Sequence, residues 1–205
     1  RETFELPSGL AGENIDFVPS GYLQASVGVI KGTEIKARFL PKMQYEDASI
    51  GLFGLGIQHD FTKLLPADKI LPVAISAVIG YTNINGDYDL SNARLIEGEN
   101  QRIEAEISSW TFGAVVSTKL PIINFYGGVN YITGKSVTDV LGTYRVNSGP
   151  FESETYEDPF SIVKKVNGVT GTLGTKLKLG FFRLNAEYNL GEFNTATVGI
   201  NFGFR

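Results

Sequence analysis

The last residues of the chain, NTATVGINFGFR at positions 194–205, alternate apolar and polar side chains without a break. One side of this segment carries Ala196, Val198, Ile200, Phe202 and Phe204, whereas the other carries threonine, glycine, asparagine and arginine. Successive side chains of a β-strand point to opposite faces, so this pattern is typical of a strand with one apolar face. The end of the chain therefore predicts a sheet that is apolar on one face only.

The same period of two recurs through most of the chain. It is found at residues 22–30, 33–40, 49–61, 73–82, 109–118, 123–132, 169–179 and 182–190. Together with the last segment, these stretches predict nine strands and no helix. Residues 103–107 continue the alternation in the opposite phase, which predicts either a bulge near Ser108 or a stretch that stands clear of a membrane.

Composition narrows the class of protein. The 205 residues include 24 Gly, 14 Phe and 9 Tyr, which favours turns and aromatic-rich strands. The net charge of −4 argues against a nucleic-acid binder, and the absence of Cys excludes disulfides and thiolate zinc sites. No stretch has the composition of a linker, so we predict a single β-barrel domain over residues 1–205. Residues 1–20 are expected to be an irregular N-terminal segment or the remnant of an upstream part.

Alternation alone fits two environments. In a soluble barrel or sandwich the apolar face points inward, whereas in a membrane barrel it points to lipid. Connection lengths favour the membrane: those at 31–32, 119–121 and 180–181 are very short, and those at 83–101 and 133–168 are long. Outer-membrane barrels have short periplasmic turns and long extracellular loops. The connections at 62–72 and 191–193 do not follow this rule.

Aromatic residues near the predicted strand ends resemble the girdles found at membrane interfaces. They are Tyr22, Phe39, Phe61, Tyr81, Trp110, Tyr131, Phe182 and Tyr188. We therefore predict an all-β fold, a transmembrane antiparallel up-and-down β-barrel, in the outer membrane of a Gram-negative bacterium and surrounded by its lipids. Because bacterial single-chain barrels usually have an even number of strands, nine strands also predict a missing or cleaved N-terminal portion.

The charged residues of the predicted strands lie on the polar side. A Lys or Arg on the lipid face at mid-membrane costs about 2–4 kcal/mol, so these charges are expected to line the lumen. The candidates are Glu34, Lys36, Arg38, Lys176, Lys178, Arg183 and Glu187. They could line a pore or bind an anionic ligand, and the alternative is a salt-bridged interior packed with side chains.

Other candidate chemistry is weak. The lone His59 lies beside Asp60, but no nucleophile elbow is visible and an interfacial histidine is the simpler interpretation. Gly54 and Gly56 lie inside a strand and make no nucleotide-binding motif. The acidic residues of the long connections show no metal-ligand spacing. We predict no catalytic residue, no metal and no cofactor.

Five segments suggest a relationship. They are LQASVGVIKGTEIKARFLPK at 23–42, GLFGLGIQHDFTKLLP at 51–66, LPVAISAVIGYT at 71–82, NFYGGVNY at 124–131 and AEYNLGEFNTATVGINFGFR at 186–205. The chain resembles an uncharacterised family of Bacteroidota outer-membrane proteins, which is distantly similar to FadL-type barrels. The resemblance implies a conduit for small hydrophobic compounds. Phe204 resembles the C-terminal signal read by the barrel-assembly machinery, although Arg205 follows it.

Three functions compete at this point. The first is the conduit for a small hydrophobic molecule, and the second is a non-transporting structural or interaction barrel that presents extracellular loops to partners. The third is an enzyme that depends on His59, which the sequence supports least.

Overall fold

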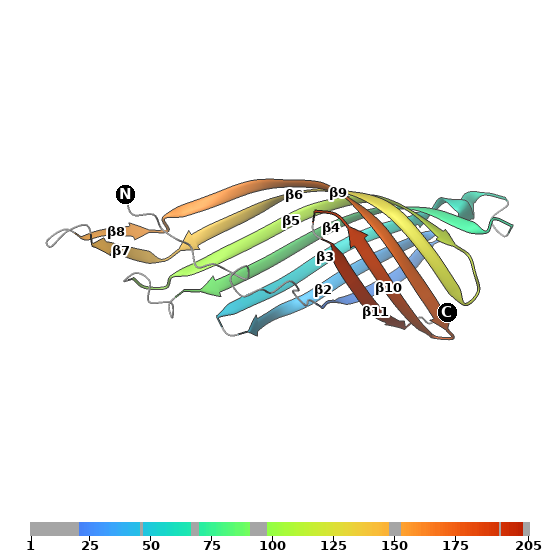
Figure 1. The fold of residues 1–205 in the computed structure, drawn as a ribbon, viewed down its shortest axis with the longest axis horizontal. Helices are drawn as coiled ribbons and strands as arrows, with labels where there is room; N and C mark the ends of the chain where they lie inside the picture. The colour runs from blue at the N-terminus through green and yellow to red at the C-terminus, as the bar shows by residue number, and fades with distance from the viewer. Residues whose placement is uncertain are drawn as a thin grey trace.

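The computed structural model describes residues 21–45, 47–66, 70–90, 98–147, 153–192 and 194–202. Its main feature is a nine-stranded antiparallel sheet in which neighbours in the sheet follow one another along the chain, apart from one hairpin inserted between β6 and β9 (Figure 1). The strands are β1 (Leu23–Ile30), β2 (Thr33–Tyr45), β3 (Ala48–Asp60), β4 (Val73–Asp89), β5 (Arg102–Thr118), β6 (Ile123–Leu141), β9 (Phe160–Leu179), β10 (Phe182–Leu190) and β11 (Thr195–Phe202). The inserted hairpin consists of β7 (Thr143–Asn147) and β8 (Ser153–Glu157).

The predicted all-β, up-and-down fold is confirmed, and the nine predicted strands form the main sheet, whereas the hairpin of β7 and β8 was not predicted. The only helix in the described part of the chain is the short 3-10 helix η2 (Phe61–Leu64), which begins where the Asp60 carboxylate accepts a hydrogen bond from the Thr62 backbone N–H. None of the described helices is long and apolar enough to cross a membrane.

Tight turns close one end of the sheet. The β1–β2 turn contains Gly32 with φ +85°, and the β9–β10 turn contains Gly180 with φ +68°. Residues with a side chain rarely adopt a positive φ, so glycine suits both turns. The two short connections predicted at these positions are confirmed. We call this end, to which the β5–β6 connection and η2 also belong, the turn end.

The sheet curls along its strand order (Figure 1). Lys36 on β2 lies within electrostatic range of Lys176 on β9 and Glu187 on β10, although five strands lie between β2 and β10 in the sheet order. Such distant strands can approach only across the hollow of a curled sheet. The face that carries these three residues is therefore the concave, inner face. β1 and β11 are the two edges, and no pairing joins them among the described residues.

The long loops predicted at 83–101 and 133–168 are wrong in large part. β4 continues to Asp89 and β5 begins at Arg102, while β6 runs to Leu141 and β9 starts at Phe160. These four strands have 17 to 20 residues each. On β4, β5 and β9 the alternation changes phase rather than ending, and the change of phase conceals the rest of the strand in the sequence. We call the part of the sheet beyond the change the extension.

Register shows where the strands bend. β2 shifts its pairing with β3 between Leu40 and Met43, where Pro41 has no backbone N–H to donate. The bulge predicted near Ser108 is wrong, because β5 pairs with both neighbours through Ser108 without a shift. The N-terminal segment at 1–20 and the predicted assembly signal Phe204 lie outside the described residues.

Candidate functional site

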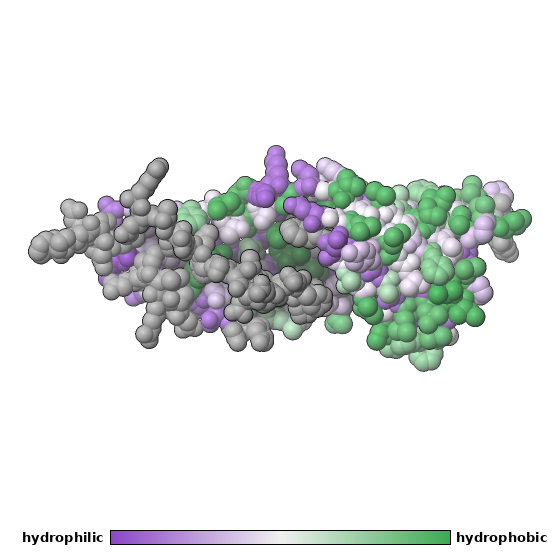
Figure 2. All heavy atoms as spheres, in the orientation of Figure 1, coloured by the Kyte–Doolittle hydropathy of each residue, from purple (hydrophilic) through white to green (hydrophobic). Residues whose placement is uncertain are grey.

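An apolar band covers the outer face of the sheet near the turn end. Cross-strand pairs place Tyr81 opposite Trp110 and Ile79 opposite Phe112. The rings of Tyr81 and Trp110 lie 5.2 Å apart between centroids. Trp110 and Ile79 are both 49% exposed, although large apolar side chains are usually buried. Figure 2 shows apolar atoms gathered over this end of the molecule, at the right of the view.

The band has a defined height. Its outward apolar alternation runs over residues 73–81 on β4, 110–118 on β5, 123–131 on β6 and 169–179 on β9, which is 9 to 11 residues per strand. Three of the predicted aromatic residues, Tyr81, Trp110 and Tyr131, belong to these stretches. Tyr22 does not, because the Arg38 guanidinium lies over the Tyr22 ring, 5.5 Å from the centroid, and Arg38 is on the inner face.

Beyond the band, the polarity of the two faces reverses. On β4 the outward positions after Tyr81 are Asn83, Asn85 and Asp87, whereas the inward positions are Ile84 and Tyr88 around a glycine. On β5 the outward positions become acidic or basic and the inward ones are Ile103, Ala105 and Ile107. β3 and β9 show the same reversal. The opposite phase seen in the sequence at residues 103–107 therefore results from one continuous strand whose apolar side changes face.

The inner face of the extension forms an apolar trough. Its large members, assigned by register, are Leu40, Met43, Ile50, Leu52, Ile84, Tyr88, Ile103, Ile107, Val140, Phe160, Ile162 and Val166. Met43 is 57% exposed and Ile162 is equally open. The trough was missed from the sequence, although its signal, the inverted alternation, was present.

Polar contacts hold the outer face of the extension. The ammonium of Lys42 pairs with Asp87, and Arg102 Nε contacts Glu104 Oε1 at 2.8 Å. The contact with the Lys42 ammonium lowers the pKa of the Asp87 carboxyl. This face therefore has the chemistry of an ordinary water-exposed sheet.

The inner face near the turn end is polar. Lys36 Nζ donates to Gln58 Oε1 at 2.6 Å, and Arg38 Nε donates to Gln24 Oε1 at 2.8 Å. Small or polar residues, Gly54 among them, face inward between these side chains. We call this region the polar lumen.

A second chain of hydrogen bonds lines the opposite wall of the polar lumen. Tyr126 Oη donates to Glu187 Oε2 at 3.0 Å, and Asn189 Nδ2 donates to Glu187 Oε1 at 3.1 Å. Thr172 Oγ1 donates to Asn189 Oδ1 at 2.6 Å, and Asn130 Nδ2 donates to Thr172 Oγ1 at 3.1 Å. The network links β6, β9 and β10.

All seven charged residues predicted for the lumen lie on the inner face. Four of them, Glu34, Arg38, Lys176 and Glu187, gather around a fifth, Lys36. The other two lie toward the turn end, where Lys178 Nζ donates to the Leu120 carbonyl oxygen at 3.2 Å and Arg183 lies opposite Lys178 in the ladder.

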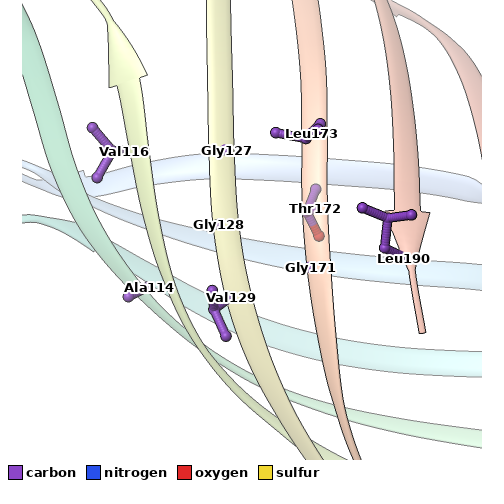
Figure 3. Close-up of a pocket in the computed structure, with 9 residues that line it drawn as sticks. All are labelled: Ala114, Val116, Gly127, Gly128, Val129, Gly171, Thr172, Leu173 and Leu190. Atoms are coloured by element: carbon purple, nitrogen blue, oxygen red, sulfur yellow. The ribbon is translucent and has the colours of Figure 1, made fainter. Parts of the chain in front are cut away.

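A groove of about 500 Å³ crosses the outer face of β5, β6, β9 and β10 within the apolar band (Figure 3). Gly127 and Gly171 leave its floor without side chains, and Val129, Leu173 and Leu190 stand along it. This groove was not predicted from the sequence, because only the register brings the two glycines onto neighbouring strands.

His59 contacts a threonine hydroxyl and an aromatic ring. Its Nδ1 lies 2.8 Å from Thr33 Oγ1, and its ring meets Phe61 edge to face with centroids 4.9 Å apart. Thr33 and His59 are cross-strand partners on the outer face. In the described part of the chain, no three His, Asp or Glu side chains gather so that they could hold a metal ion.

Comparison with known proteins yields one match. No curated protein and no solved structure matches the chain. A family model described as a family of unknown function (DUF6588) matches residues 1–204. Since the match covers nearly the whole of the 205 residues, the chain belongs to the DUF6588 family.

Proposed function

We propose that the chain is an outer-membrane β-barrel protein that takes up small hydrophobic compounds. The reversal of polarity between the apolar band and the extension carries this proposal. A soluble barrel would keep its apolar face inward along the whole length of each strand. Here the apolar face is outward over one part of β4, β5 and β9 and inward over the rest of each strand.

The height of the apolar band fits a bilayer. A transmembrane β-strand needs about 9–11 residues, and the outward apolar alternation lasts 9 to 11 residues on β4, β5, β6 and β9. Within the same stretch, the charged residues of the strands face the lumen. Lipid would surround the band, and the extension would stand outside the cell in water, where an outward Asp or Glu carries little cost.

The apolar trough supports uptake of hydrophobic compounds rather than ions. Ligand sites for small molecules are concave and mostly apolar with few polar groups, which describes the inner face of the extension. Below it, hydrogen-bonded side chains such as Lys36 and Glu187 occupy the polar lumen, so an open aqueous pore has less support.

Folding with and without detergent tests the membrane part. The purified protein should fold only in detergent or lipid, which far-UV circular dichroism and resistance to protease can measure. A chain that is folded and monodisperse in plain buffer would reverse the orientation of the sheet.

Variants of the trough test the hydrophobic cargo. Ile84→Asp and Ile107→Asp place charges in the trough and should weaken binding of an apolar fluorescent probe, whereas Asn85→Asp on the outward face of the same strand should not. Uptake of hydrophobic compounds by cells that lack the gene should fall. Unchanged uptake, together with equal probe binding by all three variants, would exclude the conduit.

The inserted hairpin supports a second function, an interaction barrel. Gly142 N donates to Asp158 Oδ1 at 2.8 Å, and Tyr144 is 9% exposed with its hydroxyl bonded to the Leu141 carbonyl. These contacts tie β7 and β8 to the extension, so the hairpin is held as a defined surface. Deletion of residues 143–157 should abolish capture of a partner in a native pull-down while leaving probe binding intact, if this function is the correct one.

A further inference from the structure

Two lysines face each other just beyond the apolar band. Lys135 on β6 is the cross-strand partner of Lys165 on β9, and both belong to the outer face. Both are exposed, and neither ammonium forms an ion pair or hydrogen bond with a residue that the structure describes. Like charges directly opposite on a sheet repel each other, with Cβ atoms about 5 Å apart. An anion bound between the two ammonium groups would therefore offset their repulsion.

Polar groups beside the pair add a donor. Thr133 Oγ1 donates to Asn167 Oδ1 at 2.7 Å, one pair closer to the band. This contact leaves the Asn167 amide N–H₂ without an acceptor in the described residues. The acidic residue on this face nearest in register is Glu106, which faces Val137 and accepts a hydrogen bond from Asn83 Nδ2 at 2.7 Å. The site therefore has two positive charges and one amide donor, and the nearest carboxylate, that of Glu106, already accepts a hydrogen bond from Asn83.

The outer groove lies below the lysines on the same two strands. Val129 beside the groove is six residues from Lys135 on β6, which corresponds to about 20 Å along the strand. One leaflet of a bilayer is about 15 Å of hydrocarbon, and barrel strands are tilted by about 45°. A chain that begins at the lysines and follows β6 therefore reaches the groove near mid-bilayer. This length suits an acyl chain.

From this arrangement we propose that Lys135, Lys165 and the outer groove bind a lipid with a phosphate monoester headgroup. The phosphate lies between the two ammoniums and one acyl chain enters the groove over Gly127 and Gly171. A phosphate monoester carries about −1.5 to −2 charges at pH 7, which matches two lysines better than a singly charged diester does. The inference rests on the proposed function, because it needs the apolar band to lie in lipid.

Lipid titration followed by native mass spectrometry tests the site. The detergent-folded protein is titrated with phosphatidic acid, a monoester, and with phosphatidylglycerol, a diester, of the same acyl chains. Wild-type protein should retain phosphatidic acid preferentially. Lys135→Gln and Lys165→Gln should each weaken its retention about tenfold, the effect expected when a charged hydrogen bond is lost. Lys164→Gln is the matched control, because this neighbour lies on the inner face at the same height.

A groove variant separates the acyl chain from the headgroup. A Cβ added at Gly171 meets only the Leu190 Cβ at 3.9 Å, so Gly171→Leu fills the groove without a clash at its first atom. It should weaken retention of phosphatidic acid, whereas Gly168→Leu on the inner face, where a Cβ meets nothing within 4 Å, should not. Inorganic phosphate at the lipid concentration should displace little lipid.

Several outcomes would overturn the inference. They are equal retention of both lipids, equal loss in Lys164→Gln and Lys165→Gln, full retention in Gly171→Leu, or displacement by inorganic phosphate, which would indicate a site for the free anion. Each leaves the proposed function standing if the protein still folds only in detergent. A protein folded in plain buffer would instead overturn the proposed function and this site with it.

Discussion

The apolar band and the extension are built from the same strands and present opposite faces. β4 carries Ile79 outward in the band and Ile84 inward in the extension, only five residues later. The hydrogen-bond ladder is the same on both sides of the change, since β4 and β5 pair without a shift from Val73 to Asp89. Backbone pairing is therefore the same in both regions. The polarity of the side chains alone decides which face contacts water and which contacts an apolar environment.

The largest expected effect comes from a charge placed in the band. Ala77→Lys, at the middle of the 73–81 stretch, should cost about 2–4 kcal/mol of unfolding free energy in lipid, because an ammonium on the lipid face at mid-membrane loses its hydration. Asn85→Lys faces outward on the same strand in the extension and should change stability by less than about 0.5 kcal/mol. Urea unfolding in lipid vesicles measures both. Equal costs for the two variants would remove the distinction between band and extension.

A smaller effect is expected in the polar lumen. Glu187→Ala removes the acceptor for the Tyr126 hydroxyl and the Asn189 amide, and should cost about 2 kcal/mol. Glu187→Gln keeps one accepting oxygen and should cost less. The same unfolding experiment compares them. If alanine were tolerated without loss, the lumen would be filled with water rather than held by side chains.

Alanine substitutions at two glycines allow the turn end to be compared with the extension. Gly142 has φ +109° and a Cβ there would lie 2.5 Å from the Asn100 carbonyl oxygen, whereas Gly180 has φ +68° and open space around it. Both alanine variants are strained by about 1 kcal/mol, and Gly142→Ala should cost more because of the additional clash. Thermal unfolding ranks the two. The reverse order would show that the hairpin junction yields more easily than the turn.

The smallest effect should appear on acidification of the extension. Lys42 lowers the pKa of Asp87, so the contribution of this carboxylate to stability is present above the unfolded value near 4 and is lost as pH falls through the lower folded value. Asp87→Asn should flatten this pH dependence slightly between about pH 5 and 2, because the pair is solvent-exposed. Unfolding midpoints of both proteins across this range are the measurement, and high salt should diminish their difference.

Much of the fold follows from local pattern. Nine alternating segments predict nine strands, and glycines at 32 and 180 mark two turns that the structure confirms. The inward placement of all seven charged candidates also follows, because period-two alternation assigns a face to every residue of a continuous strand. The long loops predicted at 83–101 and 133–168 were wrong because the same rule requires an alternation that keeps its phase. An alternation that changes phase looks like a strand that ends, and only Ser108 paired in register on both sides shows that β5 continues.

By itself, then, the sequence determined the strands, their turn glycines and which side chains share a face, because these depend on neighbours two residues apart. Tertiary structure alone decided what lies across from what. Lys135 meets Lys165, Gly127 and Gly171 share one groove, and Lys36 approaches Glu187 only because distant strands pair or curl toward each other. Such contacts join residues far apart along the chain, and no local pattern encodes their register.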